Sequence, residues 1–231
     1  MRKPRLGKEI KWDENVELPP PVVFKDELEE KIKRWSKDLR WIRRAFLEIA
    51  TYGNLLMDPG PFLIEMIKYC YLHDKRTLNN IEKKLKKVKR EIENAAPYDE
   101  NNIWTVQCRE HAIARLTYYL EIIDAIKRKA DLSLDEIEDG INAIRWLSKL
   151  LNAENVDVNE EKVKIMLERI KKLVSVALLE EINEEQRKKI LKALEKLSKN
   201  TRLPKLNGDL LLKLEAMIYL CDTIYYRLTK H

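Results

Sequence analysis

The stretch that decides the fold reads LEEKIKRWSKDLRWIRRAFLEI and covers residues 28–49. Its apolar side chains recur with a four-three spacing, which is the period of a helix that buries one narrow face. The side chains on this face are Leu28, Ile32, Trp35, Leu39, Ile42, Phe46 and Ile49. The pattern predicts one long helix, which we expect to run from about Lys25 to Leu56 before the Asp58-Pro59 step ends it.

A cationic stripe with one indole lies on the opposite side of this predicted helix. At about 100° per residue, the stripe contains Lys33, Lys37, Arg40 and Arg44, with Trp41 among them. A Trp among cations is costly to leave in water. We therefore expect an exposed surface that stacks a nucleic-acid base on the indole and holds phosphates with the cations.

The alternative for this stripe is an ordinary solvated face. Glu29 stands four residues before Lys33, and Arg44 stands four residues before Glu48, so each pair can form locally on a helix. In that case Trp41 packs against another helix or another subunit.

The rest of the chain also has the helical period, and no segment alternates polar and apolar residues as a strand does. Capping residues mark several helix starts: Ser133 with Glu136 forms a capping box, and Asn159 and Asn183 are N-caps. We predict an all-α bundle of about eight helices over residues 24–231, with a subdomain break near 131–135 or 152–159. Residues 1–23, which are basic and then rich in proline, are expected to form an extended arm.

A second basic stripe lies on the helix expected between Thr77 and Pro97. Its apolar face is a single narrow row made of Leu78, Ile81, Leu85, Val88 and Ile92. Lys83, Lys87 and Arg90 fall opposite that row, and Lys86 lies beside them. The arm adds Arg2, Lys3 and Arg5, which are suited to following the groove of a nucleic acid.

Composition sets the compartment and the broad class. The 231 residues carry 45 Lys and Arg against 39 Asp and Glu, a net charge of +6. Three cysteines that lie far apart are typical of free thiols in a reducing, cytoplasmic compartment. No apolar stretch is long enough to span a bilayer, so no membrane partner is expected. Many Lys, Glu and Ile residues with few Gly are typical of hyperthermophilic proteins. A basic arm before a helical bundle is similar to the layout of some archaeal filamentous-virus coat proteins.

Cysteine and histidine occur twice with the same spacing. Cys70 and His73 lie one helical turn apart, and so do Cys108 and His111. Two such pairs can complete a tetrahedral zinc shell if they meet. The alternative is that the thiols are small buried core groups, and we expect no metal.

Two acidic pairs have a comparable spacing. Glu121 and Asp124 lie one turn apart, and Glu136 and Asp139 repeat the arrangement on the next helix. The stretch DEIEDGINAI, residues 135–144, resembles the acidic motif of the all-α MazG-like nucleotide pyrophosphohydrolases, which implies a magnesium site between helices. The first pair departs from the denser Glu-x-x-Glu motif of that family. The alternative is that acids simply favour a helix N-terminus.

We expect a non-catalytic, nucleic-acid-binding helical subunit without a cofactor, within a larger nucleoprotein assembly. The alternatives are a scaffold for protein contacts or homo-oligomers, which would use the narrow apolar rows and the opposed charge patches, and a magnesium-dependent nucleotide hydrolase.

Overall fold

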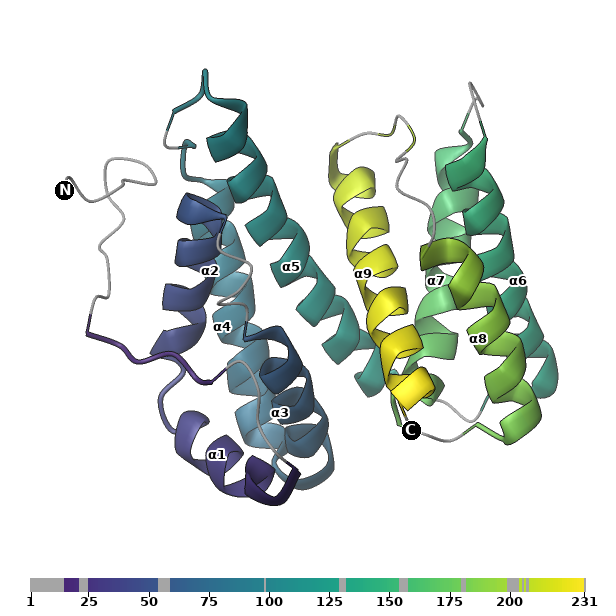
Figure 1. Cartoon of the computed structure of the whole chain (residues 1–231), viewed down its shortest axis with the longest axis horizontal. Coiled ribbons are helices and arrows are strands. Elements are labelled where there is room, and N and C mark those ends of the chain that lie inside the picture. Colours follow the sequence, from purple (N-terminus) through teal and green to yellow (C-terminus); the bar gives the residue numbers. More distant parts are fainter. Residues whose placement is uncertain are drawn as a thin grey trace. The chain divides into compact units, whose positions relative to one another are not determined.

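The computed structural model describes residues 15–20, 25–53, 59–97, 99–128, 132–153, 158–179, 182–198, 204, 206 and 208–230. Within these ranges every regular element is a helix and no strand occurs, which confirms the predicted all-α class. The α-helices are α1 (Leu28–Trp35), α2 (Arg40–Tyr52), α3 (Gly60–His73), α4 (Lys75–Glu93), α5 (Ile103–Lys127), α6 (Leu134–Asn152), α7 (Glu160–Leu178), α8 (Glu184–Ser198) and α9 (Gly208–Lys230), shown in Figure 1. A 3-10 turn, η1 (Lys25–Glu27), precedes α1.

The chain divides into two compact units, which are described separately. Unit 1 is Met1–Leu120 and unit 2 is Glu121–His231, so the division falls inside α5. It does not coincide with either of the two connections that the sequence indicated, 131–135 and 152–159. The division lies within one continuous helix, so neither a loop nor a change in composition marks it in the sequence.

In unit 1, α4 packs against both α2 and α3, and α1 packs against α3. Aromatic rings connect the helices in the core: Phe46 meets Tyr119 of α5 at a centroid distance of 5.8 Å. Gly53 ends α2 with a positive φ of 61°, and a Cβ placed on it would lie 2.9 Å from the Trp104 ring. Only glycine fits this left-handed position, where α2 meets the start of α5.

The prediction of one uninterrupted helix from about Lys25 to Leu56 is wrong. α1 ends at Trp35, and α2 begins at Arg40 after a four-residue interruption. The Asp38 carboxylate accepts a hydrogen bond from the Arg40 backbone N–H at 3.0 Å. Such a local side-chain bond offers the backbone an alternative to the helical hydrogen-bond ladder and favours a turn. The helical spacing read before Trp35 therefore does not predict which side chains of α2 face the core.

In unit 2, the four helices α6–α9 form a bundle. α6 packs against α7 and α8, and α9 packs against the same two helices, so the order around the bundle is α6, α7, α9, α8 (Figure 1). Gly140 sits where α6 meets α7, because a Cβ placed on it would lie 2.6 Å from the Cβ of Leu173. Glycine thus allows the two backbones to approach closely.

The predicted helix starts of unit 2 are confirmed. Ser133 and Glu136 form a reciprocal capping box at the start of α6. The Asn159 side chain accepts a hydrogen bond from the Lys162 backbone N–H at 3.0 Å, and Asn183 does the same for Gln186 at 2.9 Å. Each cap satisfies a backbone donor that the first helical turn leaves open.

Candidate nucleic-acid interface

Trp41 is fully buried, so the prediction of an exposed indole is wrong. Its exposed fraction is 0%. The indole Nε1–H donates a hydrogen bond to the Trp35 backbone carbonyl at 3.0 Å, and the ring lies 6.2 Å from that of Phe62, centroid to centroid. The end of α1 at Trp35 leaves that carbonyl without a helical donor, and the indole satisfies it. Trp41 is a core residue of unit 1 and offers no stacking surface.

The cations of the first stripe lie on separate elements, and three of them are held by acids nearby. Lys33 of α1 pairs with Glu29 at 2.5 Å, and Arg40 of α2 pairs with Asp38 at 2.6 Å. Hydrogen bonds from these partners lower the pKa of both Glu29 and Asp38.

Arg44 is half-buried. It pairs with Glu48 at 2.9 Å and donates to the backbone carbonyl of Val16, where the arm crosses unit 1. Lys37 is exposed in the turn between α1 and α2. The solvated-face alternative therefore describes this stripe.

The second stripe is intact on α4. All eight exposed positions of α4 are Lys, Arg or Asn. They are Lys75, Arg76, Asn79, Asn80, Lys83, Lys86, Lys87 and Arg90. The opposite side is the predicted apolar row, from Leu78 to Ile92, whose five members are each at most 1% exposed. We call the four predicted cations of this helix, Lys83, Lys86, Lys87 and Arg90, the α4 basic face.

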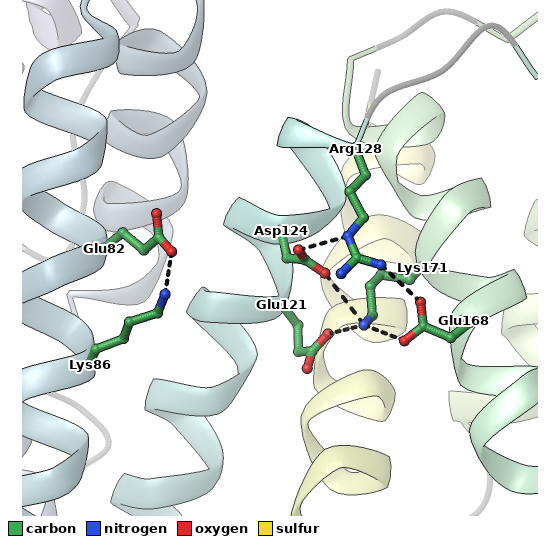
Figure 2. A network of polar contacts seen from close by, with 7 residues as sticks. All are labelled: Glu82, Lys86, Glu121, Asp124, Arg128, Glu168 and Lys171. Atoms are coloured by element: carbon green, nitrogen blue, oxygen red, sulfur yellow. Dashed lines mark hydrogen bonds and ion pairs between the residues drawn. The ribbon is translucent and has the colours of Figure 1, made fainter. Parts of the chain in front are cut away.

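The acids of α4 lie beside this face and are half-buried. Glu82 pairs with Lys86 at 2.6 Å (Figure 2). The other two acids bind cations that do not belong to the α4 basic face: Glu91 pairs with Arg43 of α2 at 2.5 Å, and Glu93 pairs with Lys89 at 2.7 Å.

Three members of the α4 basic face have no such partner. Within the described ranges, Lys83, Lys87 and Arg90 form no ion pair. The outer side of α4 is therefore a row of cations with no carboxylate among them, and it attracts polyanions.

Sequence reasoning missed two exposed cations of α4, Lys75 and Arg76. Arg76 is exposed and stands seven residues before Lys83, which in turn stands seven residues before Arg90. A seven-residue interval returns to the same side of a helix, so this spacing was the available signal. The arm residues Arg2, Lys3 and Arg5 lie outside the described residues.

The cysteine–histidine pairs do not form a metal site in the part of the chain that the structure describes, where no three His, Cys, Asp or Glu side chains are grouped to hold an ion. Cys70 and Cys108 are both buried, while His73 is exposed at the end of α3 and stacks near Tyr69. Burial raises the pKa of the Cys70 thiol to about 11. Because thiolate is the form that binds metals, this environment favours the alternative of core cysteines.

The first acidic pair surrounds a lysine. Lys171 of α7 places its Nζ 3.0 Å from Glu121 Oε2 and 3.4 Å from Asp124 Oδ2 of α5. It also lies 2.8 Å from Glu168 Oε1, and Arg128 links Asp124 and Glu168 from the other side (Figure 2). Burial alone would lower the pKa of Lys171, but the hydrogen bond to Glu168 and the charge of Glu121 raise it above the ordinary value.

The second acidic pair is also neutralised by α7. Glu136 pairs with Lys172 at 3.1 Å, and Asp139 lies 3.7 Å from Arg169. Each of the four acids therefore lies within ion-pair distance of a cation. In unit 2 these acids join α5 and α6 to α7, which is a structural role.

Comparison with known proteins gives no relative: no family model, no curated protein and no solved structure matches the chain. Among the described helices, none combines the length and the apolar character that crossing a membrane requires.

Proposed function

We propose that this chain is a non-catalytic nucleic-acid-binding subunit that holds the phosphate backbone with the α4 basic face. The observation that carries the proposal is the composition of the exposed side of α4, where every position is Lys, Arg or Asn. Lys and Arg bind phosphate by charge and hydrogen bonding, and Asn adds neutral donors.

The arrangement of acids supports the same function. Glu91 and Glu93 neutralise Arg43 and Lys89, which are half-buried, and Lys83, Lys87 and Arg90 are left uncompensated. A surface that served solubility alone would carry both signs of charge interspersed. Lys83, Lys87 and Arg90 instead form one block of positive charge on a helix that is anchored along its whole length by its buried row.

The proposal is tested by measuring the affinity of a mixed-sequence DNA for the wild type and for the triple variant Lys83→Gln/Lys87→Gln/Arg90→Gln, by fluorescence anisotropy at low salt. Gln keeps a polar, helix-compatible side chain at exposed positions, so the fold is retained. Each lost phosphate contact costs about tenfold in affinity at ~50 mM salt, so the three together should weaken binding about 1,000-fold.

A matched control comes from unit 2. The triple variant Lys149→Gln/Lys188→Gln/Lys192→Gln removes three exposed cations and changes the net charge by the same amount. The proposal predicts that this control binds much more tightly than the α4 variant. Equal loss in both triple variants would mean that only total charge matters, and the α4 basic face would lose its role.

A second candidate is a protein-binding role, favoured by exposed apolar side chains in unit 1. Ile103 and Trp104 at the start of α5 are 73% and 56% exposed. Light scattering without nucleic acid tests this candidate, because an oligomer that Trp104→Ser dissociates would support it.

A further inference from the structure

We infer that the α4 basic face binds double-helical nucleic acid in preference to a single strand. This inference rests on the proposed function and adds the class of ligand. Three features of the described residues carry it: the absence of aromatic rings on the exposed side of α4, the fixed spacing of its cations, and the concentration of its charge.

Aromatic rings are the first feature. Proteins that hold single strands combine a cationic groove with aromatic side chains on which bases stack. None of the exposed positions of α4 carries an aromatic ring. Trp41, the indole that the sequence placed beside cations, is buried in the core of unit 1. The α4 basic face therefore contacts phosphates without offering a surface to an unstacked base.

The fixed spacing of the cations is the second feature. Leu78, Ile81, Leu85, Val88 and Ile92 are buried along the length of α4, which holds the helix rigidly against α2 and α3. Lys83 and Arg90 are separated by a rise of about 10 Å along the helix axis. If α4 lies along a duplex, this rise equals the axial advance of about three nucleotides of one strand, at ~3.4 Å each.

A duplex is the form that suits a rigid row. Its persistence length of about 50 nm means that its phosphates are already ordered over the length of α4. A single strand would lose conformational freedom to reach the same contacts, and no stacking on the α4 basic face would compensate for that loss.

The third feature is the concentration of positive charge on the α4 basic face, which favours the ligand with the higher density of negative charge. A duplex condenses more counterions than a single strand, so each phosphate contact releases about 0.9 ions from a duplex and about 0.7 from a single strand. Over the four cations of the α4 basic face, this difference corresponds to about tenfold tighter binding of the duplex at ~50 mM salt.

The test compares one labelled DNA strand, its complement and their duplex, all longer than α4, by fluorescence anisotropy with the full chain. We expect the duplex to bind about tenfold more tightly than either strand at ~50 mM salt. Tighter or equal binding of a single strand would overturn this inference and leave the proposed function standing. No binding of any of the three would overturn both.

A Trp104 variant makes the comparison sharper, because Trp104 is an exposed indole elsewhere in unit 1. Trp104→Ala should leave the duplex affinity unchanged, since the duplex keeps its bases stacked on each other. If this variant weakens binding to the duplex, Trp104 contacts the ligand, and the inference that the duplex is held by the α4 basic face without aromatic contacts would be contradicted.

Discussion

Trp41 donates its indole N–H to the carbonyl oxygen of Trp35 across the turn that separates α1 from α2. This one bond connects the end of one helix with the first turn of the next. The bond forms where the predicted long helix is interrupted, and it explains the loss of the predicted stacking surface, because an indole used in this way is not available to a ligand.

The first prediction concerns Trp41 itself. Trp41→Phe keeps an aromatic ring beside Phe62 but leaves the Trp35 carbonyl without its donor, so the free energy of unfolding should fall by about 1–3 kcal/mol. The measurement is chemical denaturation of the full chain. DNA affinity of the folded variant should match the wild type, and weaker binding with unchanged stability would return Trp41 to the interface.

The second prediction uses the acid beside the α4 basic face. Glu82→Gln removes the carboxylate that neutralises Lys86, so DNA should bind about 3- to 10-fold more tightly at ~50 mM salt. Lys86→Gln removes a cation and keeps the Glu82 carboxylate beside the face, so DNA should bind about 3- to 10-fold more weakly. Titration of both variants with the same duplex checks the pair, and weaker binding by Glu82→Gln would contradict the assigned surface.

The third prediction separates two neighbouring lysines of α7. The Lys171 side chain is 11% exposed and pairs with three carboxylates. Lys171→Met leaves Glu121 without its cation, while Asp124 and Glu168 keep Arg128. Its free energy of unfolding should fall by about 2–3 kcal/mol. Lys172→Met breaks only an exposed pair with Glu136 and should cost less than about 1 kcal/mol. Similar costs for the two variants would show that the cluster of Figure 2 does not stabilise unit 2.

The fourth prediction concerns pH and Glu136. The Ser133 backbone N–H, with Lys172, holds the pKa of Glu136 below its ordinary value of 4.5. A lowered pKa in the folded state adds stability above pH 4.5, and that stability is lost as the pH falls through the lowered pKa. Glu136→Gln keeps an acceptor for the capping box but cannot ionise.

Unfolding of the wild type and of Glu136→Gln should therefore differ at neutral pH, with the wild type more stable, and converge once the pH is below that lowered pKa. The comparison is made by denaturation across this pH range. A difference that persists unchanged at acid pH would show that the side chain acts through packing rather than charge.

The sequence predicted the α4 basic face well because one helix carries both the face and the row that buries it. The interval between Leu78, Leu85 and Ile92 is seven residues, and a pattern confined to one uninterrupted helix keeps its phase. The capping residues Ser133 and Asn159 were equally readable, since a cap depends on its immediate neighbours alone.

The sequence did not predict that Trp41 is buried. The helical spacing that begins at Leu28 was continued across the interruption between α1 and α2, where it no longer holds. Within α2 alone, Trp41, Ala45 and Ile49 are spaced by four residues, which places the indole on the buried side. The interruption at Asp38 was not visible in the sequence, because it lies in a short polar segment of a kind that helices also contain. The ion-pair partner that Glu121 and Asp124 share comes from α7, and local sequence patterns do not say where α7 packs.

The salt dependence of binding tests the central claim most directly. The logarithm of the association constant for a duplex is measured against the logarithm of the salt concentration, for the wild type and for Lys83→Gln/Lys87→Gln/Arg90→Gln, over a salt range in which both still bind. Loss of three phosphate contacts predicts a slope shallower by about 2.7 in the variant. Identical slopes for the two proteins would contradict the claim that α4 holds the phosphate backbone.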